Sequence, residues 1–195
     1  VKILVAGIIA RYPFGGVTWC SLMYLLGLRA LGHEVFYIED TGECIYDPVL
    51  NTRSEDPGYG TRYISDALTP FGFGDRWTFV NYDGVYHGAS RATVQAFCAD
   101  ADLFINLSGG AWFWREEYAR IPRRIFIDSD PVFTQLAIAK GDPWYVEFFR
   151  GVPLVVLVLM SDVALAFFFP RDLLPGKVVR VIVAFAPGGF VDGAA

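Results

Sequence analysis

The first residues that could bind a ligand follow the first apolar run of the chain. Gly7 ends that run, and Arg11, Gly15 and Gly16 come after it, before a second apolar stretch. Glycine lets a backbone approach a ligand closely, free amides at a helix start bind anions, and arginine forms paired hydrogen bonds with carboxylates or phosphates. We therefore predict that Arg11, Gly15 and Gly16 line a polar binding site. The alternative is that the glycines only form a tight turn and that Arg11 is solvated.

A second candidate is His87, which lies in the loop 81–88 (NYDGVYHG). Aromatic and polar side chains together suit sugar rings, which bind by stacking and hydrogen bonding. Histidine titrates near neutral pH, so His87 is the candidate general base. The alternative is an ordinary loop histidine. His33 follows a helix-ending glycine at the opposite edge of the expected sheet, where a structural role is expected.

Two further polar groups follow apolar runs. Ser108 and Gly109 belong to the segment 106–110 (NLSGG), which is the second candidate wall of the binding site after the segment that holds Arg11, Gly15 and Gly16. Asp128 and Asp130 form the third candidate wall, and an Asp-x-Asp pair could bind a metal. Asp130 precedes Pro131, and proline favours the first helical position, so we expect Asp130 to cap a helix. Asp128 is expected to bind the ligand or the loop, and no metal site is predicted.

Apolar runs bounded by Gly, Pro and Asp predict the elements that position these residues. We expect parallel strands near residues 2–7, 34–38, 76–80, 103–107 and 124–128. Helices are expected over 17–31, 61–68, 90–98, 133–140 and 144–150, with a long loop over 41–60. Strands that alternate with helices predict an α/β fold, a Rossmann-like three-layer domain with a parallel sheet over residues 1–150. The polar residues then share the carboxyl edge of the sheet, where such folds bind ligands.

Composition and motifs exclude several classes of protein. Of 195 residues, 54% are hydrophobic and 19% charged, which allows a large core and argues against disorder. The net charge of −5 argues against nucleic-acid binding. The glycine spacing is not GxGxxG, so the sequence does not indicate binding of a nicotinamide or flavin dinucleotide. The sequence also has no Ser-His-Asp arrangement, no Walker motif and no zinc-ligand spacing. The three cysteines are expected to be free thiols.

The chain changes character after about residue 150. Residues 152–169 are strongly apolar but include Asp162, and they are short for a bilayer span. We do not expect them to contact a membrane. With the small residues 164–166 (ALA), this run has the form of a secretory signal peptide placed inside the chain. Within the folded chain we expect this run to form a helix at the sheet edge, with an added strand at 179–184. The alternatives are a buried core helix or a pair of strands. Since no basic and apolar leader precedes residues 1–150, we expect them to be cytoplasmic.

Residues 1–150 resemble the N-terminal domain of GT-B-fold glycosyltransferases. The resemblance lies in residues 2–7 (KILVAG), 14–16 (FGG), 28–35 (LRALGHEV), 106–110 (NLSGG) and 127–131 (IDSDP). In that family the N-terminal domain mainly holds the acceptor, and a second Rossmann-like domain holds most of the nucleotide-sugar contacts. The resemblance implies that residues 1–150 form the acceptor-binding half of a nucleotide-sugar-dependent transferase.

Residues 151–195 do not continue this resemblance. Residues 152–195 resemble the signal peptide and N-terminus of solute-binding proteins of tripartite tricarboxylate transporters, through 164–166 (ALA) and 179–192 (VRVIVAFAPGGFVD). In that family the turn matched by 185–189 (FAPGG) holds a carboxylate ligand. We interpret 151–195 as an unrelated fragment, so its deletion should leave the first domain folded.

These features lead to one expectation of function and one alternative. The chain is expected to be an incomplete glycosyltransferase that binds a small-molecule acceptor but no nucleic acid. No cofactor is expected to bind tightly, and a nucleotide sugar would be the co-substrate once a donor domain is present. Alone, the chain is not expected to turn over substrate. The alternative is a non-catalytic protein that binds a small ligand or a carboxylate. The oligomeric state is not predicted.

Overall fold

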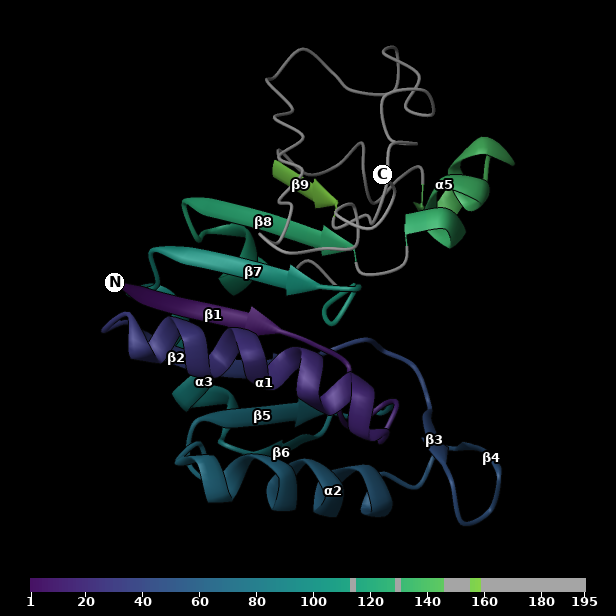
Figure 1. The fold of residues 1–195 in the computed structure, drawn as a ribbon, viewed down its shortest axis with the longest axis horizontal. Coiled ribbons are helices and arrows are strands. Elements are labelled where there is room, and N and C mark those ends of the chain that lie inside the picture. The colour runs from purple at the N-terminus through teal and green to yellow at the C-terminus, as the bar shows by residue number, and fades with distance from the viewer. Residues whose placement is uncertain (113–114, 129–130, 146–154, 159–195) are drawn as a thin grey trace, which may run out of the picture. The chain divides into compact units, whose positions relative to one another are not determined.

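A computed structural model describes residues 1–112, 115–128, 131–145 and 155–158 (Figure 1). The chain divides into two compact units, 1–124 and 125–195, which are described in turn.

The first unit is an α/β structure built on a mostly parallel sheet. Its strands are ordered β6-β5-β2-β1-β7. β1, β2, β5 and β7 run in the same direction, and only β6 is antiparallel to its neighbour β5. The four parallel strands confirm the predicted apolar runs: β1 (Lys2–Ala6), β2 (Glu34–Glu39), β5 (Trp77–Val80) and β7 (Leu103–Leu107).

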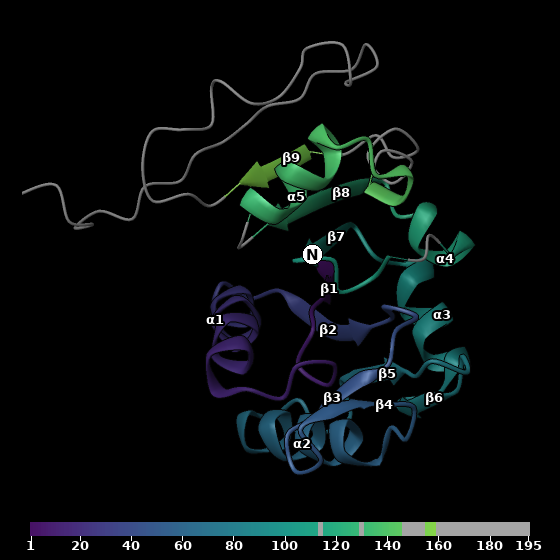
Figure 2. The same cartoon turned by 90° about the vertical axis from the view of Figure 1, so that its right-hand side faces the viewer.

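Helices cover both faces of this sheet, with α1 (Gly15–Ala30) on one side and α3 (Arg91–Ala99) on the other (Figure 2). Residues 3–6 of β1 are therefore all buried, as expected of a parallel strand between two helical layers. Alternate strand side chains face the α3 side, where they pack with α3 and the short α4 (Glu116–Ala119). The principal members of this cluster are Leu4, Phe36, Ile38, Val94, Phe97, Phe104, Tyr118 and Ile121.

Local signals at the helix ends agree with the structure. Ser90 caps α3, because its hydroxyl accepts the backbone N–H of Thr93 at 3.2 Å. Gly32 follows the last turn of α1 at φ = +83°, a left-handed conformation that glycine adopts without strain. The predicted helix over 61–68 is also found, as α2 (Gly58–Leu68), which continues into the short 3-10 helix η1 (Thr69–Phe71).

Two segments expected to be loops contain strands. The segment 41–60 includes a hairpin formed by β3 (Ile45–Asp47) and β4 (Thr52–Ser54). The side chain of Asp47 accepts the N–H groups of Val49 and Leu50, which closes the hairpin turn. β6 (Tyr86–Gly88) pairs with β5 after a turn held by Asn81. Both are three-residue strands, too short to produce a recognisable alternation in the sequence.

The second unit contains most of β8 (Arg123–Asp128), together with α5 (Pro131–Ala139) and β9 (Val155–Val158). β8 and the start of α5 confirm the predicted strand and the proline at the first helical position. β9 pairs in parallel with β8, Ile125 opposite Val155. The expectation of a helix over 152–169 is therefore wrong at 155–158, where three valines favour a strand.

Several expectations for the second unit concern residues outside those described. These are Asp130 as a helix cap, helix 144–150 beyond residue 145, the strand at 179–184 and the solute-binding-like turn. Among the described residues, no helix combines the length and apolar character needed to cross a membrane.

Candidate functional site

The carboxyl edge of the first unit brings together the segments that follow β1, β2 and β7. Because these strands are parallel and adjacent, the loop 7–14, the acidic tip of β2 and the loop 108–112 all begin at the same edge. β2 lies on one side of β1 and β7 on the other, which is where open α/β sheets bind ligands. The structure thus places Arg11, Gly15 and Gly16 at the same edge as Ser108 and Gly109.

At this edge Gly7 and Gly110 pack directly on each other. A Cβ atom on Gly110 would lie 2.2 Å from the nitrogen and 2.5 Å from the Cα of Gly7. The carbonyl of Gly110 also accepts the N–H of Asp40 at 2.8 Å. Asn106 fixes the same loop, since its side-chain amide donates to the carbonyl of Ala111 at 2.8 Å. Gly110 is therefore required for its close approach to the backbone of Gly7, and a Cβ atom on Gly7 would lie 2.8 Å from the hydroxyl of Tyr37 and 2.9 Å from that of Ser21. Both glycines are needed for contacts within the protein itself.

The carboxyl group of Glu39 accepts hydrogen bonds from two backbone amides of the β1–α1 loop. Its Oε2 accepts the N–H of Ala10 at 2.7 Å, and its Oε1 accepts the N–H of Arg11 at 2.5 Å. The hydroxyl of Tyr37 donates to Oε2 at 3.3 Å. Glu39 is fully buried, and this burial raises the pKa of its carboxyl from 4.5 to about 8 despite the three donors. Two amides that could have met a ligand anion are therefore already bonded within the protein.

Arg11 is held by neighbouring side chains. Its guanidinium pairs with Glu43, which also lies 3.6 Å from Arg53, and it stacks 4.9 Å from the ring centre of Tyr12. Only 11% of the Arg11 side chain is exposed. A ligand anion would have to displace Glu43 before it could pair with this arginine.

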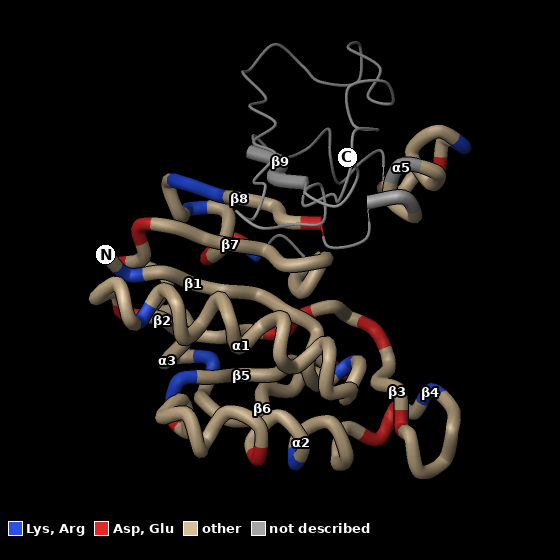
Figure 3. The backbone as a smooth tube through the Cα atoms, in the orientation of Figure 1, with Lys and Arg blue, Asp and Glu red and all other residues tan. Residues whose placement is uncertain are grey.

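The segment that follows β2 carries more acidic than basic side chains. From the end of β2 to the start of α2, acidic residues are spaced along the connecting segment (Figure 3). They are Glu39, Asp40, Glu43, Asp47, Glu55 and Asp56, and the same segment holds a single basic residue, Arg53. Glu39 is buried, and Asp40 and Glu43 pair with arginines from outside the segment. The exposed Glu55 and Asp56 still disfavour an anionic ligand on the surface of this segment.

Asp40 forms the centre of a buried polar cluster that joins β2 to α4. Its carboxylate accepts hydrogen bonds from Nε of Arg115 at 2.5 Å, from Nη2 of Arg115 at 3.0 Å and from the hydroxyl of Tyr118 at 2.9 Å. The hydrogen bonds to Asp40 raise the pKa of Arg115, and burial raises the pKa of the Tyr118 hydroxyl. Asp40 is visible in the sequence as an acid at a strand tip, whereas nothing in the sequence links it to Arg115.

Gly15 and Gly16 begin α1 on the open side of the loop. Both are exposed, and a Cβ atom on either would meet no atom within 4 Å. Phe14, at the N-cap position, offers no side-chain hydrogen bond to the first turn. The glycines are therefore not needed for packing, and this helix start faces solvent.

Ser108 and Gly109 reverse the chain after β7. Both have positive φ, +51° and +78°, and a Cβ atom on Gly109 would lie 2.2 Å from the indole ring of Trp112. Gly109 is buried and Ser108 half-buried. The turn that they form directs the following residues across the end of β1.

Within the first unit, His87 does not lie beside the β1–α1 loop, and Asp128 is not part of this unit. His87 lies on β6, with its ring stacked 5.9 Å from that of Phe79 and its Nε2 buried without a hydrogen-bond partner. β6 is three strands from β1, a separation of about 14 Å at the usual strand spacing. Asp128 is buried and belongs to the second unit. The role of His87 as a general base stays a prediction.

No disulfide joins the three cysteines of the chain, all of which lie among the described residues. Cys20, Cys44 and Cys98 are free thiols, as predicted, and burial raises the pKa of Cys98 to about 12. Within the part of the chain that the structure describes, no three His, Cys, Asp or Glu side chains group as metal ligands.

Comparison of the chain with protein-family models, curated proteins and solved structures found no match.

Proposed function

We propose that residues 1–150 form a Rossmann-like three-layer domain of the kind found at the N-terminus of GT-B glycosyltransferases. In this proposal the domain holds a small-molecule acceptor for sugar transfer from a nucleotide sugar. The observation that carries the proposal is the bonding of Glu39 to the amides of Ala10 and Arg11. It argues for a Rossmann-like edge that does not bind the nucleotide.

The strand order supports the first part of this proposal. In the order β5-β2-β1-β7, the strand β1 lies between β2 and the later strand β7. Doubly wound nucleotide-binding folds have the same arrangement. In dinucleotide-binding members of that class, the glycine-rich turn after the first strand receives a pyrophosphate. Here the internal carboxyl group of Glu39 accepts hydrogen bonds from two amides of that turn, and Gly110 closes the space beside Gly7.

The charge at the edge supports the second part. A nucleotide sugar carries a diphosphate, and the solvent-accessible acidic side chains Asp47, Glu55 and Asp56 of the segment between β2 and α2 would repel it. An uncharged acceptor meets no such penalty. The donor would then be bound by a second domain, and both walls of the cleft would be needed to hold donor and acceptor in attack geometry.

Within this proposal the candidate residues have different tasks. Gly15 and Gly16 offer exposed backbone at the acceptor side, and Ser108 and Gly109 shape the loop beside β1. Arg11 acts through its pair with Glu43 and stiffens the β1–α1 loop. His87 remains the proposed base, and Asp128 a proposed acceptor contact.

The experiment is a binding and turnover series on the full chain. Ligand-detected NMR with UDP-, GDP- and ADP-sugars and with NAD should show no binding to the chain alone. A panel of uncharged glycosides and aglycones should show binding of at least one acceptor class. A donor domain from a GT-B enzyme, supplied in trans, should then permit sugar transfer to that acceptor.

Two outcomes would contradict the proposal. Binding of a nucleotide sugar to the chain alone would show that the donor does not need a second domain. Binding of an acceptor with no transfer under any donor domain would instead indicate a small-ligand-binding protein without catalysis.

A further inference from the structure

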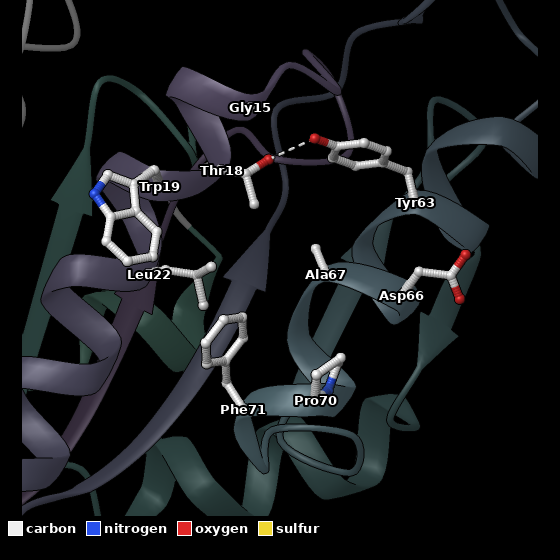
Figure 4. Close-up of a pocket in the computed structure, with 9 residues that line it drawn as sticks. All are labelled: Gly15, Thr18, Trp19, Leu22, Tyr63, Asp66, Ala67, Pro70 and Phe71. Carbon is white, nitrogen blue, oxygen red and sulfur yellow. Dashed lines mark hydrogen bonds between the residues drawn. The ribbon is translucent and has the colours of Figure 1, made fainter.

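A groove of about 390 Å³ runs between α1 and the helices α2 and η1 (Figure 4). It lies wholly within the first unit. Trp19 and Leu22 of α1 form one wall, and Ala67, Pro70 and Phe71 form the other. This volume falls within the range of small-molecule sites, which is about 300–1,000 Å³.

The walls of the groove are apolar and partly open to solvent. Trp19 is 54% exposed and Phe71 is 37% exposed, although both are large aromatic side chains. The only charged side chain of the lining is Asp66, whose carboxylate points away from Trp19 in Figure 4. An apolar occupant would gain burial against both rings, whereas an anion would find a carboxylate and no cation among the lining residues.

At one end of the groove, the hydroxyl groups of Thr18 and Tyr63 form a hydrogen bond. The Thr18 hydroxyl donates to the carbonyl of Phe14 at 3.0 Å, and it lies 2.9 Å from the hydroxyl of Tyr63. A threonine hydroxyl has one hydrogen, which is used by Phe14. With that hydrogen on Phe14, Tyr63 donates to Thr18, and the oxygen of Tyr63 keeps lone pairs that can accept from a ligand.

This directionality selects the complementary group on a ligand. The oxygen of Tyr63 can accept a hydrogen bond from a ligand donor, such as a hydroxyl group, at the end of the groove nearest Gly15. A ligand without a donor leaves that oxygen unpaired, and a carboxylate brings a second acceptor to it.

We propose that this groove is a binding site for a small planar apolar molecule that is uncharged and donates one hydroxyl hydrogen bond to Tyr63. Its aromatic body packs against the rings of Trp19 and Phe71, and its hydroxyl points toward the start of α1. The proposal stands on the groove alone and does not depend on the transferase proposal.

Three naphthalene probes test this chemistry on the full chain: naphthol, its methyl ether and naphthoate. The first has a donor, the second has none, and the third is an anion of similar size. Titrations followed by saturation-transfer NMR should give the tightest binding for naphthol. The methyl ether should bind about fivefold more weakly, as expected from the loss of one hydrogen bond. Naphthoate should bind more weakly still.

Matched variants locate the site. Tyr63→Phe should weaken naphthol binding about fivefold and remove the difference between naphthol and its ether. Tyr59→Phe is the control, because Tyr59 stacks on Tyr63 at 6.3 Å but does not line the groove. Ala67→Leu should fill the groove and abolish binding, and a thermal melt of each variant checks that it is folded.

Several results would overturn the proposal. They are no binding of naphthol at millimolar concentration, equal binding of naphthol and naphthoate, and unchanged binding in a folded Ala67→Leu variant. Equal effects of Tyr63→Phe and Tyr59→Phe would also overturn it, since the hydroxyl of Tyr63 would then have no special part.

Discussion

Glu39 accepts the backbone N–H of Arg11 at 2.5 Å, so an internal carboxyl group lies where an anion would meet the β1–α1 loop. The same carboxyl group accepts from Ala10 through its other oxygen and lies fully buried between the sheet and the loop. This single side chain fixes the conformation of the loop and removes two amides from ligand binding.

The burial of Glu39 predicts an unusual dependence of stability on pH. Burial raises its pKa from 4.5 to about 8, so the folded state binds a proton more tightly than the unfolded state does. The stabilising contribution of this proton is complete below about pH 4.5 and is lost as the pH rises to about 8. Urea unfolding between pH 5 and pH 9 should show stability falling by up to about 1.4 kcal/mol per pH unit.

Two variants separate Glu39 from other titrating groups. Glu39→Gln cannot ionise, so its stability should be flatter across this range than that of the wild type. Glu34→Gln, at the exposed start of the same strand, should keep the wild-type slope. An identical slope in Glu39→Gln and in the wild type would refute the assignment.

Glycine contacts give a second prediction. A Cβ atom on Gly110 would overlap the backbone of Gly7, which cannot rotate away, so Gly110→Ala should destabilise the first unit by about 3 kcal/mol. Gly16→Ala is the matched control, since its position is helical and open, and it should be stabilising by about 0.5–1 kcal/mol. Chemical denaturation measures both. A tolerated Gly110→Ala would show that the loop 108–112 does not pack on β1.

The strands of the first unit could be predicted from the sequence because helices cover both faces of the sheet. Burial on both faces makes β1 and β7 continuous apolar runs, and polar residues follow them directly. The hairpin β3–β4 and the strand β6 escaped prediction. Each depends on a short turn closed by one side chain, Asp47 or Asn81, rather than on an apolar pattern.

The candidate site was predicted less completely than the fold. The sequence indicated which loops meet at the carboxyl edge. It could not indicate that Glu39 bonds to the loop amides, because the partner atoms belong to the backbone and carry no sequence signal. Asp40 and Arg115 are separated by 75 residues, and only the folded chain brings them together.

The pairing of Asp40 with Arg115 leads to a third prediction. Arg115→Met leaves a carboxylate that is 1% exposed with only the Tyr118 hydroxyl as partner, and should cost about 3 kcal/mol. Asp40→Asn should cost less, because the side chain of Arg115 is 29% exposed and can reach water. The double variant should cost less than the sum of the two. Additive losses in a double-mutant cycle would mean that the two side chains are not energetically coupled.

The last prediction concerns the end of the chain. Deletion of residues 151–195 removes β9, which pairs with β8 in the second unit, and leaves every strand pair from β6 to β7 intact. We therefore expect the first unit to stay folded, with nearly unchanged hydrogen-exchange protection in β1, β2 and β7. Protection in β8 should fall, because its amide and carbonyl groups lose the β9 partner. Loss of protection in β1 would show that residues 151–195 are an integral part of the core, and the interpretation of two unrelated segments would then be wrong.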